Sequence, residues 1–129
     1  MLKKSLPRPT DAEVAILGVL WRLGPCTVRQ VYEQLQDSRS TGYTTTLKFL
    51  QIMTEKGLVS RDESERSHVY EARLSERETQ QQLVRDLLTR AFGGSACKLV
   101  MQALHAKKSS PKELAEIRKL LDEFQGGAS

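Results

Sequence analysis

Cysteine is scarce in this chain, and its scarcity argues against several classes of protein. Only two of the 129 residues are cysteines, Cys26 and Cys97, and they lie far apart in the sequence. A disulfide-stabilised secreted domain carries several cysteines, and a structural zinc site places two of them a few residues apart. We therefore expect neither a disulfide framework nor a metal site, and we interpret both cysteines as ordinary buried thiols.

Long apolar runs are also missing. No stretch approaches the roughly 18 consecutive apolar residues that cross a bilayer. The first nine residues include Lys3, Lys4 and Arg8, but no apolar segment follows them as it would in a secretory signal peptide. These features predict a cytoplasmic protein that does not insert into a membrane.

The residue patterns that carry catalysis are absent as well. The chain has no serine, histidine and aspartate arrangement, no His-Glu-x-x-His motif and no glycine-rich phosphate loop. Cys97 and His105 lie about two helical turns apart, too far to hold one metal ion without a further ligand. The sequence therefore predicts that the protein is not an enzyme and uses no cofactor.

The residues that are present describe a small globular protein. Hydrophobic residues make up 39% of the chain and charged residues 28%, with a net charge of +4 and a pI near 9.2. This length holds one compact domain of about 75 residues and a dependent segment. The positive charge is compatible with an acidic partner such as DNA.

Helix-start and helix-stop signals divide the first part of the chain into three helices. Thr10 and Glu13 form a capping box, Thr27 is placed to cap a second helix, and Gly57 provides the stop of the third. Apolar residues recur at helical spacing after each start. The predicted helices cover about residues 10–23, 28–36 and 44–56.

The third helix has two contrasting faces. Four residues at helical spacing predict its buried side: Thr46, Phe49, Leu50 and Met53. The opposite side must then point away from the core, and it is small, polar and basic apart from one isoleucine. It consists of Thr44, Thr45, Lys48, Gln51 and Ile52.

After Gly57 the pattern becomes extended. Residues 58–61 and 68–73 alternate in side-chain type and are separated by a charged tip, which predicts a β-hairpin. Three helices followed by a hairpin are the order of a winged helix-turn-helix, whose third helix enters the major groove of DNA. The fold class is thus mainly α with a small β-hairpin, and residues 1–74 form the predicted DNA-binding domain.

The candidate DNA contacts come from this third helix and from the hairpin. These side chains also have a simpler interpretation. The polar face of the third helix is then an ordinary solvated surface, and the tyrosine only caps the core. Arg61, Arg66 and His68 then only keep the hairpin soluble. The predicted DNA-binding residues are Tyr43, Thr44, Thr45, Lys48, Gln51, Arg61 and Arg66.

Residues 75–129 predict three further amphipathic helices. They begin near Ser75, Ser95 and Ser110, and their apolar faces are wide although no sheet follows to cover them. Pairing with a second copy is the simplest way to bury these faces, so the segment is a predicted dimerisation domain. Its predicted interface residues are Leu87, Leu88, Leu99, Val100, Leu104, Leu114, Ile117 and Leu121.

Several separated motifs resemble the penicillinase repressor family, the regulators of beta-lactamase and methicillin resistance. The run Tyr43-Thr44-Thr45-Thr46-Leu47, with Glu55-Lys56-Gly57-Leu58-Val59, is similar to that family's recognition helix and first wing strand. Residues 10–21 are similar to its first helix. Phe92-Gly93-Gly94 and Leu99-Val100 resemble its C-terminal segment, so the resemblance covers nearly the whole chain.

The resemblance implies a homodimer that binds a palindromic operator in double-stranded DNA. It also implies release by a membrane-anchored metalloprotease sensor that cuts within the C-terminal segment. The family's cleavage position aligns with Gln102-Ala103, where the best-known members commonly have Asn-Phe. The Cys-x-Cys tail of copper-responsive relatives is absent. The alternative function is a protein-interaction adaptor that uses the winged-helix surface without DNA.

Overall fold

The computed structural model describes residues 8–36 and 40–126. The chain divides into two compact units, Met1–Val84 and Arg85–Ser129. The division falls within α4, Glu76–Ala91, whose first turns belong to the first unit. The sequence predicts a boundary between a DNA-binding domain and a dimerisation domain at residues 74 and 75. This functional boundary stays a prediction.

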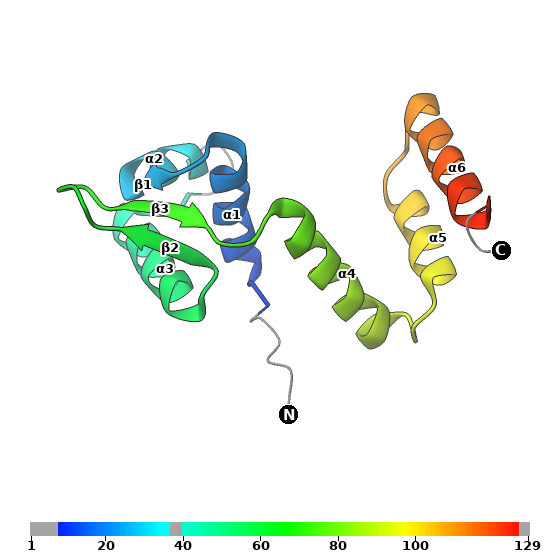
Figure 1. The fold of residues 1–129 in the computed structure, drawn as a ribbon, viewed down its shortest axis with the longest axis horizontal. Coiled ribbons are helices and arrows are strands. Elements are labelled where there is room, and N and C mark those ends of the chain that lie inside the picture. The colour runs from blue at the N-terminus through cyan, green and yellow to red at the C-terminus, as the bar shows by residue number, and fades with distance from the viewer. Residues whose placement is uncertain (1–7, 37–39, 127–129) are drawn as a thin grey trace. The chain divides into compact units, whose positions relative to one another are not determined.

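Three helices form most of the first unit (Figure 1). They are α1, Asp11–Leu23, α2, Val28–Leu35, and α3, Tyr43–Lys56, within a residue of the predicted bounds. The capping box of Thr10 and Glu13 is confirmed. Thr27 caps α2 as predicted, and the Gln30 side chain completes a second capping box there.

The end of α3 is fixed by Gly57. This residue has a φ of 85°, in the left-handed region that favours glycine, and its N–H reaches the carbonyl oxygens of Met53 and Thr54. The next strand begins two residues later, at Val59. α3 is therefore held at a defined length directly before the hairpin.

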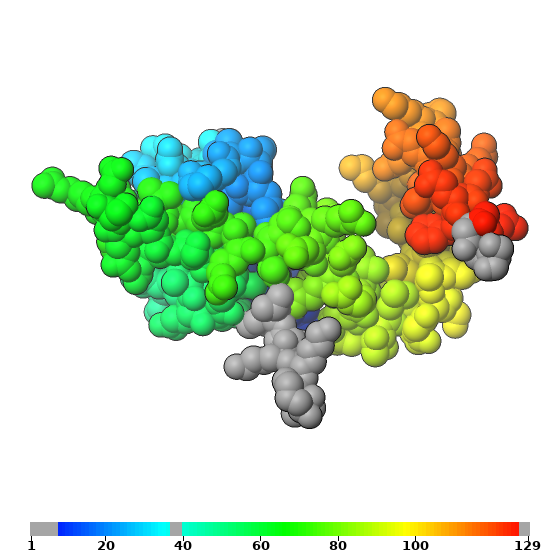
Figure 2. Space-filling view, in the orientation of Figure 1, coloured from blue at the N-terminus to red at the C-terminus, as the bar shows by residue number. Residues whose placement is uncertain are grey.

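A three-stranded antiparallel sheet packs with these helices (Figure 1). The predicted hairpin is β2, Val59–Asp62, paired with β3, Val69–Ala72. The sequence pattern missed β1, Cys26–Thr27, which pairs with β3 and gives the order β1-β3-β2. A two-residue strand is too short to show alternation. The tip between β2 and β3 projects from the body of the unit (Figure 2).

The hydrophobic core anchors α3 from beneath. Leu50 and Met53 are fully buried and Thr46 is buried beside them, as predicted, while Phe49 packs against the core only partly. The other fully buried large side chains come from α1, α2 and the sheet. They are Ile16, Val31, Val59 and Tyr70. On α1, the buried apolar residues are Ile16, Leu17, Val19 and Leu20.

A buried ion pair joins the start of α1 to the end of α3. The Glu13 side chain is 3% exposed, and its Oε1 accepts hydrogen bonds from the Thr10 backbone N–H at 2.9 Å and the Lys56 ammonium at 2.7 Å. Burial favours the protonated carboxyl, but the Lys56 and Thr10 contacts outweigh it, so the pKa of Glu13 is lowered. The Glu13–Lys56 contact is therefore a charged tether between α1 and α3.

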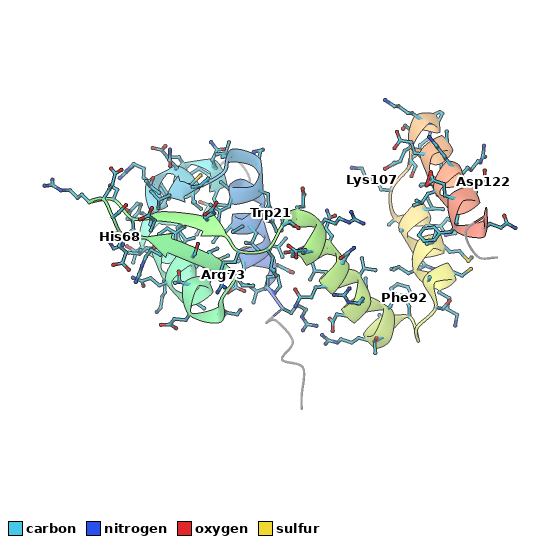
Figure 3. All side chains as sticks on the ribbon, viewed as in Figure 1. Trp21, His68, Arg73, Phe92, Lys107 and Asp122 are labelled. Atoms are coloured by element: carbon cyan, nitrogen blue, oxygen red, sulfur yellow. The ribbon has the colours of Figure 1, made fainter. Side chains whose placement is uncertain are left out.

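Trp21 on α1 holds the segment that leads into α4. The Trp21 indole N–H donates to the Leu74 carbonyl oxygen at 3.0 Å, and Trp21 packs partly against the core (Figure 3). Thr79 is buried. Trp21 therefore combines core packing with a hydrogen bond to the chain that leads into α4.

The remaining helices bury almost nothing within one chain. They are α5, Ala96–Ala106, and α6, Pro111–Gly126, capped by Ser95 and Ser110. No residue of α5 or α6 is buried, so the expectation that Cys97 is a buried thiol is wrong, whereas Cys26 is buried. Across residues 8–36 and 40–126, no helix is long and apolar enough to cross a membrane.

Candidate nucleic-acid interface

The outward face of α3 is open to solvent. Thr44, Thr45, Lys48 and Gln51 are all exposed, opposite the buried Thr46, Leu50 and Met53. Within the described part of the chain, the Lys48 ammonium has no hydrogen bond or ion pair. The structure thus places the predicted hydroxyls, amide and cation where a duplex could reach them.

Tyr43 lies at the joint between α2 and α3. Its ring meets the Tyr32 ring edge to face, with centroids 5.7 Å apart, and the Arg29 guanidinium carbon lies 5.4 Å from its centroid. Arg29 also forms an exposed ion pair with Glu33 at 3.9 Å. Since Tyr43 is 41% exposed, it packs onto α2 and still reaches solvent.

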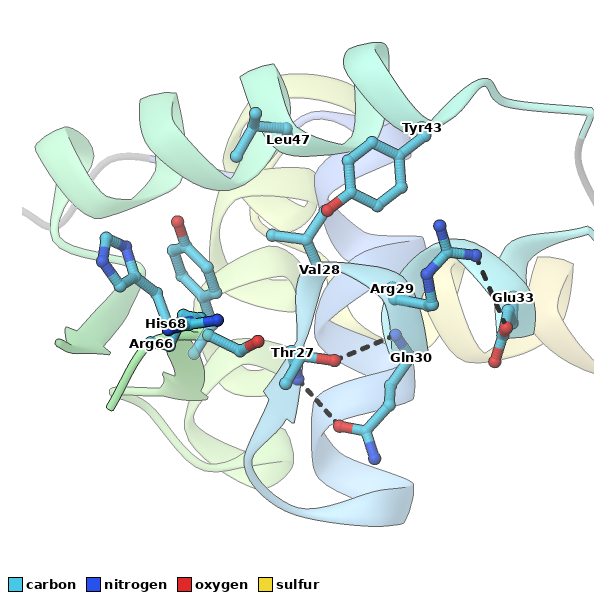
Figure 4. A pocket seen from close by; sticks show the side chains of 11 residues that line it. Thr27, Val28, Arg29, Gln30, Glu33, Tyr43, Leu47, Arg66 and His68 are labelled. Atoms are coloured by element: carbon cyan, nitrogen blue, oxygen red, sulfur yellow. Dashed lines mark hydrogen bonds and ion pairs between the residues drawn. The ribbon is translucent and has the colours of Figure 1, made fainter. Parts of the chain in front are cut away.

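A hollow of about 580 Å³, here called the α2–wing hollow, adjoins this joint (Figure 4). Side chains of α2, α3 and the hairpin surround it, among them the cationic Arg29 and Arg66 and the imidazole of His68. Glu33 is the only carboxylate in its lining. The full lining is Thr27, Val28, Arg29, Gln30, Glu33, Tyr43, Leu47, Arg66, Ser67, His68 and Tyr70.

The hollow brings together residues that are distant in sequence. Arg66 and His68 come from the wing, defined here as residues 59–72, and both are exposed. Neither has a hydrogen bond or ion pair to another described residue. The sequence singled out Arg66 and His68, whereas the position of Arg29 beside the wing depends on the tertiary fold.

Arg61 is held differently from Arg66. Its Nε and Nη2 both lie 2.7 Å from Glu63 Oε2. The Tyr70 hydroxyl and the Glu63 carboxylate raise the pKa of Arg61, so its charge is secure. A phosphate contact by Arg61 would have to share the guanidinium with Glu63, a constraint that the sequence pattern did not reveal.

The predicted dimerisation residues are largely solvent-exposed. Leu87, Val100, Leu104, Leu114 and Leu121 are between 36% and 59% exposed, while Leu88, Leu99 and Ile117 are half-buried. Further large apolar side chains in this segment are exposed with them. These are Val84, Met101, Leu120 and Phe124, the last at 70%.

The residues at the predicted cleavage position are accessible in a single chain. Gln102 and Ala103 lie on α5 and both are exposed. The described residues contain no group of three or more His, Cys, Asp or Glu side chains that could hold a metal ion.

Comparison with known protein sequences gives a family match over most of the chain. The profile of the penicillinase repressor family matches residues 9–123. The transcriptional regulator BlaI of Mycobacterium tuberculosis is 42% identical over 66 residues, which cover 50% of this chain and 48% of that protein. In this match the chain spans about half the length of its relative. The penicillinase repressor of Bacillus licheniformis is 22% identical over 122 residues, 95% of each chain.

Solved structures support the fold. The DNA-binding domain of the repressor BlaI matches with a TM-score of 0.51 and 23% identity, over 57% of this chain and 90% of that domain. The monomeric form of Bacillus licheniformis BlaI, solved with the blaP half-operator, matches with 0.51 and 22%, over 59% and 93%. These similarities establish a winged-helix fold and confirm the predicted fold class.

Proposed function

Because the chain belongs to the penicillinase repressor family, we propose that it is a homodimeric transcriptional repressor that acts in the cytoplasm and binds palindromic operator DNA. The observation that carries this proposal is the exposed face of Thr44, Thr45, Lys48 and Gln51 on a helix anchored by fully buried residues. Short hydroxyls at the start of such a helix, and an amide two turns further on, can reach base edges in the major groove. Repression follows from occlusion of the operator, which needs no catalytic group.

The second support is the α2–wing hollow beside that face. Arg66, which has no hydrogen bond or ion pair to another described residue, lines the hollow together with Arg29, so two guanidinium groups offer positive charge next to α3. Phosphate contacts of this kind fix the register of a protein on DNA without reading sequence. The relative from Bacillus licheniformis was solved with a half-operator, in line with one recognition helix for each half-site.

Dimerisation rests on the uncovered apolar surface of α4–α6. Two copies that cover Leu104, Leu114 and Leu121 would remove these side chains from water, a favourable change of roughly 25 cal/mol for each Å² of apolar area buried. A two-fold dimer would present two recognition helices roughly 34–36 Å apart, or a multiple of that spacing. The operator would then be a palindrome with matching half-site spacing.

Release of the repressor would come from proteolysis of this dimerisation segment. A cut at the exposed Gln102–Ala103 bond would divide α5 and separate α6 from the rest of the chain. We infer that the protease is a membrane-anchored metalloprotease sensor, as the family resemblance implies. Loss of the dimer would then lower the affinity for a two-half-site operator.

Two measurements on the full chain test this function. In gel shifts with DNA from upstream of its own gene, we expect a complex that weakens as the salt concentration rises. This complex should persist when a scrambled duplex of equal length is added as competitor. Sedimentation should show that the free protein is a dimer and that two chains bind each operator. A protein-interaction adaptor would instead give no sequence-preferring complex, and that result would reject the repressor.

A further inference from the structure

An exposed aliphatic side chain, Ile52, lies on the outward face of α3. Ile52 is 38% exposed, and all other residues on the outward face of this helix are polar or charged. Single exposed aliphatic residues are common on protein surfaces and by themselves need no explanation. Ile52 is notable because it lies on the same face of α3 as the predicted DNA contacts.

Helix geometry places Ile52 in line with two predicted DNA contacts. Thr45, Lys48 and Ile52 are spaced by three and four residues, so they lie along one side of the helix. The rise of an α-helix puts Ile52 about 10 Å beyond Thr45, a distance of roughly three base pairs. One α3 can therefore present both residues to the same stretch of groove.

The charge of the face sets its far limit. Glu55, the next outward residue after Ile52, is an exposed carboxylate that backbone phosphates would repel. Lys48, one turn before Ile52, supplies the cation of this face. Ile52 thus lies between a cation and a carboxylate on this face, and its own side chain carries no charge with which to bind a phosphate.

We propose that Ile52 is a specificity-determining residue that contacts the 5-methyl group of a thymine in the major groove. This inference rests on the proposed function. The thymine methyl is the apolar group that distinguishes a base pair in the major groove, and aliphatic side chains recognise it by excluding water. Ile52 cannot recognise the polar base edges of the groove, because its side chain carries no hydrogen-bond donor or acceptor.

The test removes the methyl group from the DNA and the side chain from the protein. A binding duplex is first selected from a random pool with the full chain, and each thymine is then replaced in turn by deoxyuridine. At one thymine of each half-site we expect about fourfold weaker binding by the native protein, the effect of losing one methyl-sized apolar contact. Ile52→Ala should bind the thymine and deoxyuridine duplexes equally at that position.

Leu23→Ala is the matched control, since Leu23 is an aliphatic residue of the same unit, 50% exposed, but on α1. It should keep the fourfold preference for thymine. Two results would overturn the inference: no thymine at which the methyl group matters, or a methyl dependence that Ile52→Ala retains at every such thymine. Failure to select any duplex would reject the proposed function itself, and this inference with it.

Discussion

The ion pair between Glu13 and Lys56 allows a quantitative prediction of how much the contact between α1 and α3 contributes to stability. Replacing Glu13 by glutamine keeps the size of the side chain and an oxygen that can accept from the Thr10 N–H, but it removes the negative charge opposite Lys56. The substitution therefore isolates the contact that ties α1 to the last residue of α3.

The expected loss of unfolding free energy follows from the burial of the two partners. A hydrogen bond to a charged group contributes about 1.5–3 kcal/mol net. The Lys56 side chain is 28% exposed, so its ammonium can regain some water when the carboxylate is removed, and this favours the lower end. We expect Glu13→Gln to lose about 1.5 kcal/mol in urea unfolding at pH 7 and fixed protein concentration.

The pH dependence gives an independent check on the same contact. The pKa of Glu13 lies below its ordinary value of 4.5, so its contribution is fully present above pH 4.5. It is lost as the pH falls through the lower pKa of the folded state, because the carboxyl is then protonated. The stability difference between wild type and Glu13→Gln should therefore shrink in acid.

The control is Glu33→Gln, which breaks the exposed pair with Arg29. Both partners are at least 60% exposed, so the expected loss is below about 0.5 kcal/mol. A double-mutant cycle of Glu13→Gln with Lys56→Gln should give a coupling energy above about 0.5 kcal/mol. A coupling near zero, or a stability difference that grows in acid, would refute this account of the tether.

Three further predictions concern the core, the dimer and the wing. Leu50→Ala should lower the unfolding free energy by about 3 kcal/mol in urea, because Leu50 is fully buried; a loss below about 1 kcal/mol would contradict that packing. Leu121→Asp should sediment as a monomer at concentrations where wild type is a dimer, and an unchanged dimer would remove Leu121 from the interface. Arg66→Ala should weaken binding to operator and scrambled DNA by similar factors in fluorescence anisotropy, whereas a selective loss of operator affinity would make Arg66 a base-reading residue.

Local sequence signals predicted the helices of this chain well. Capping boxes and terminal glycines are properties of neighbouring residues, so α1 and the end of α3 were located from the sequence with small errors. The exposed face of α3 was also predictable, because helical spacing separates Thr44, Thr45 and Lys48 from the buried Leu50.

Features made by distant residues could not be predicted in the same way. Strand β1 forms only because Cys26 and Thr27 pair with β3, and the α2–wing hollow forms only where the fold brings α2 beside the wing. The Glu13–Lys56 contact joins residues 43 positions apart. Such pairs leave no periodic signal in the sequence.

The exposure of Cys97 shows a related limit. An apolar helical stripe predicts that a face will be covered, but it does not identify the covering surface. Among the described residues, α5 has no buried side chain, and Cys97 on it is exposed.

The salt dependence of DNA binding by Lys48→Ala tests most directly the claim that the outward face of α3 rests on DNA. The plot of log affinity against log salt should flatten by about 0.9 for each half-site, because one phosphate contact is lost there. Lys112→Ala, which removes an exposed lysine of α6, should leave the slope unchanged. If the slope for Lys48→Ala equals that of wild type, α3 does not present this face to the duplex and the account fails.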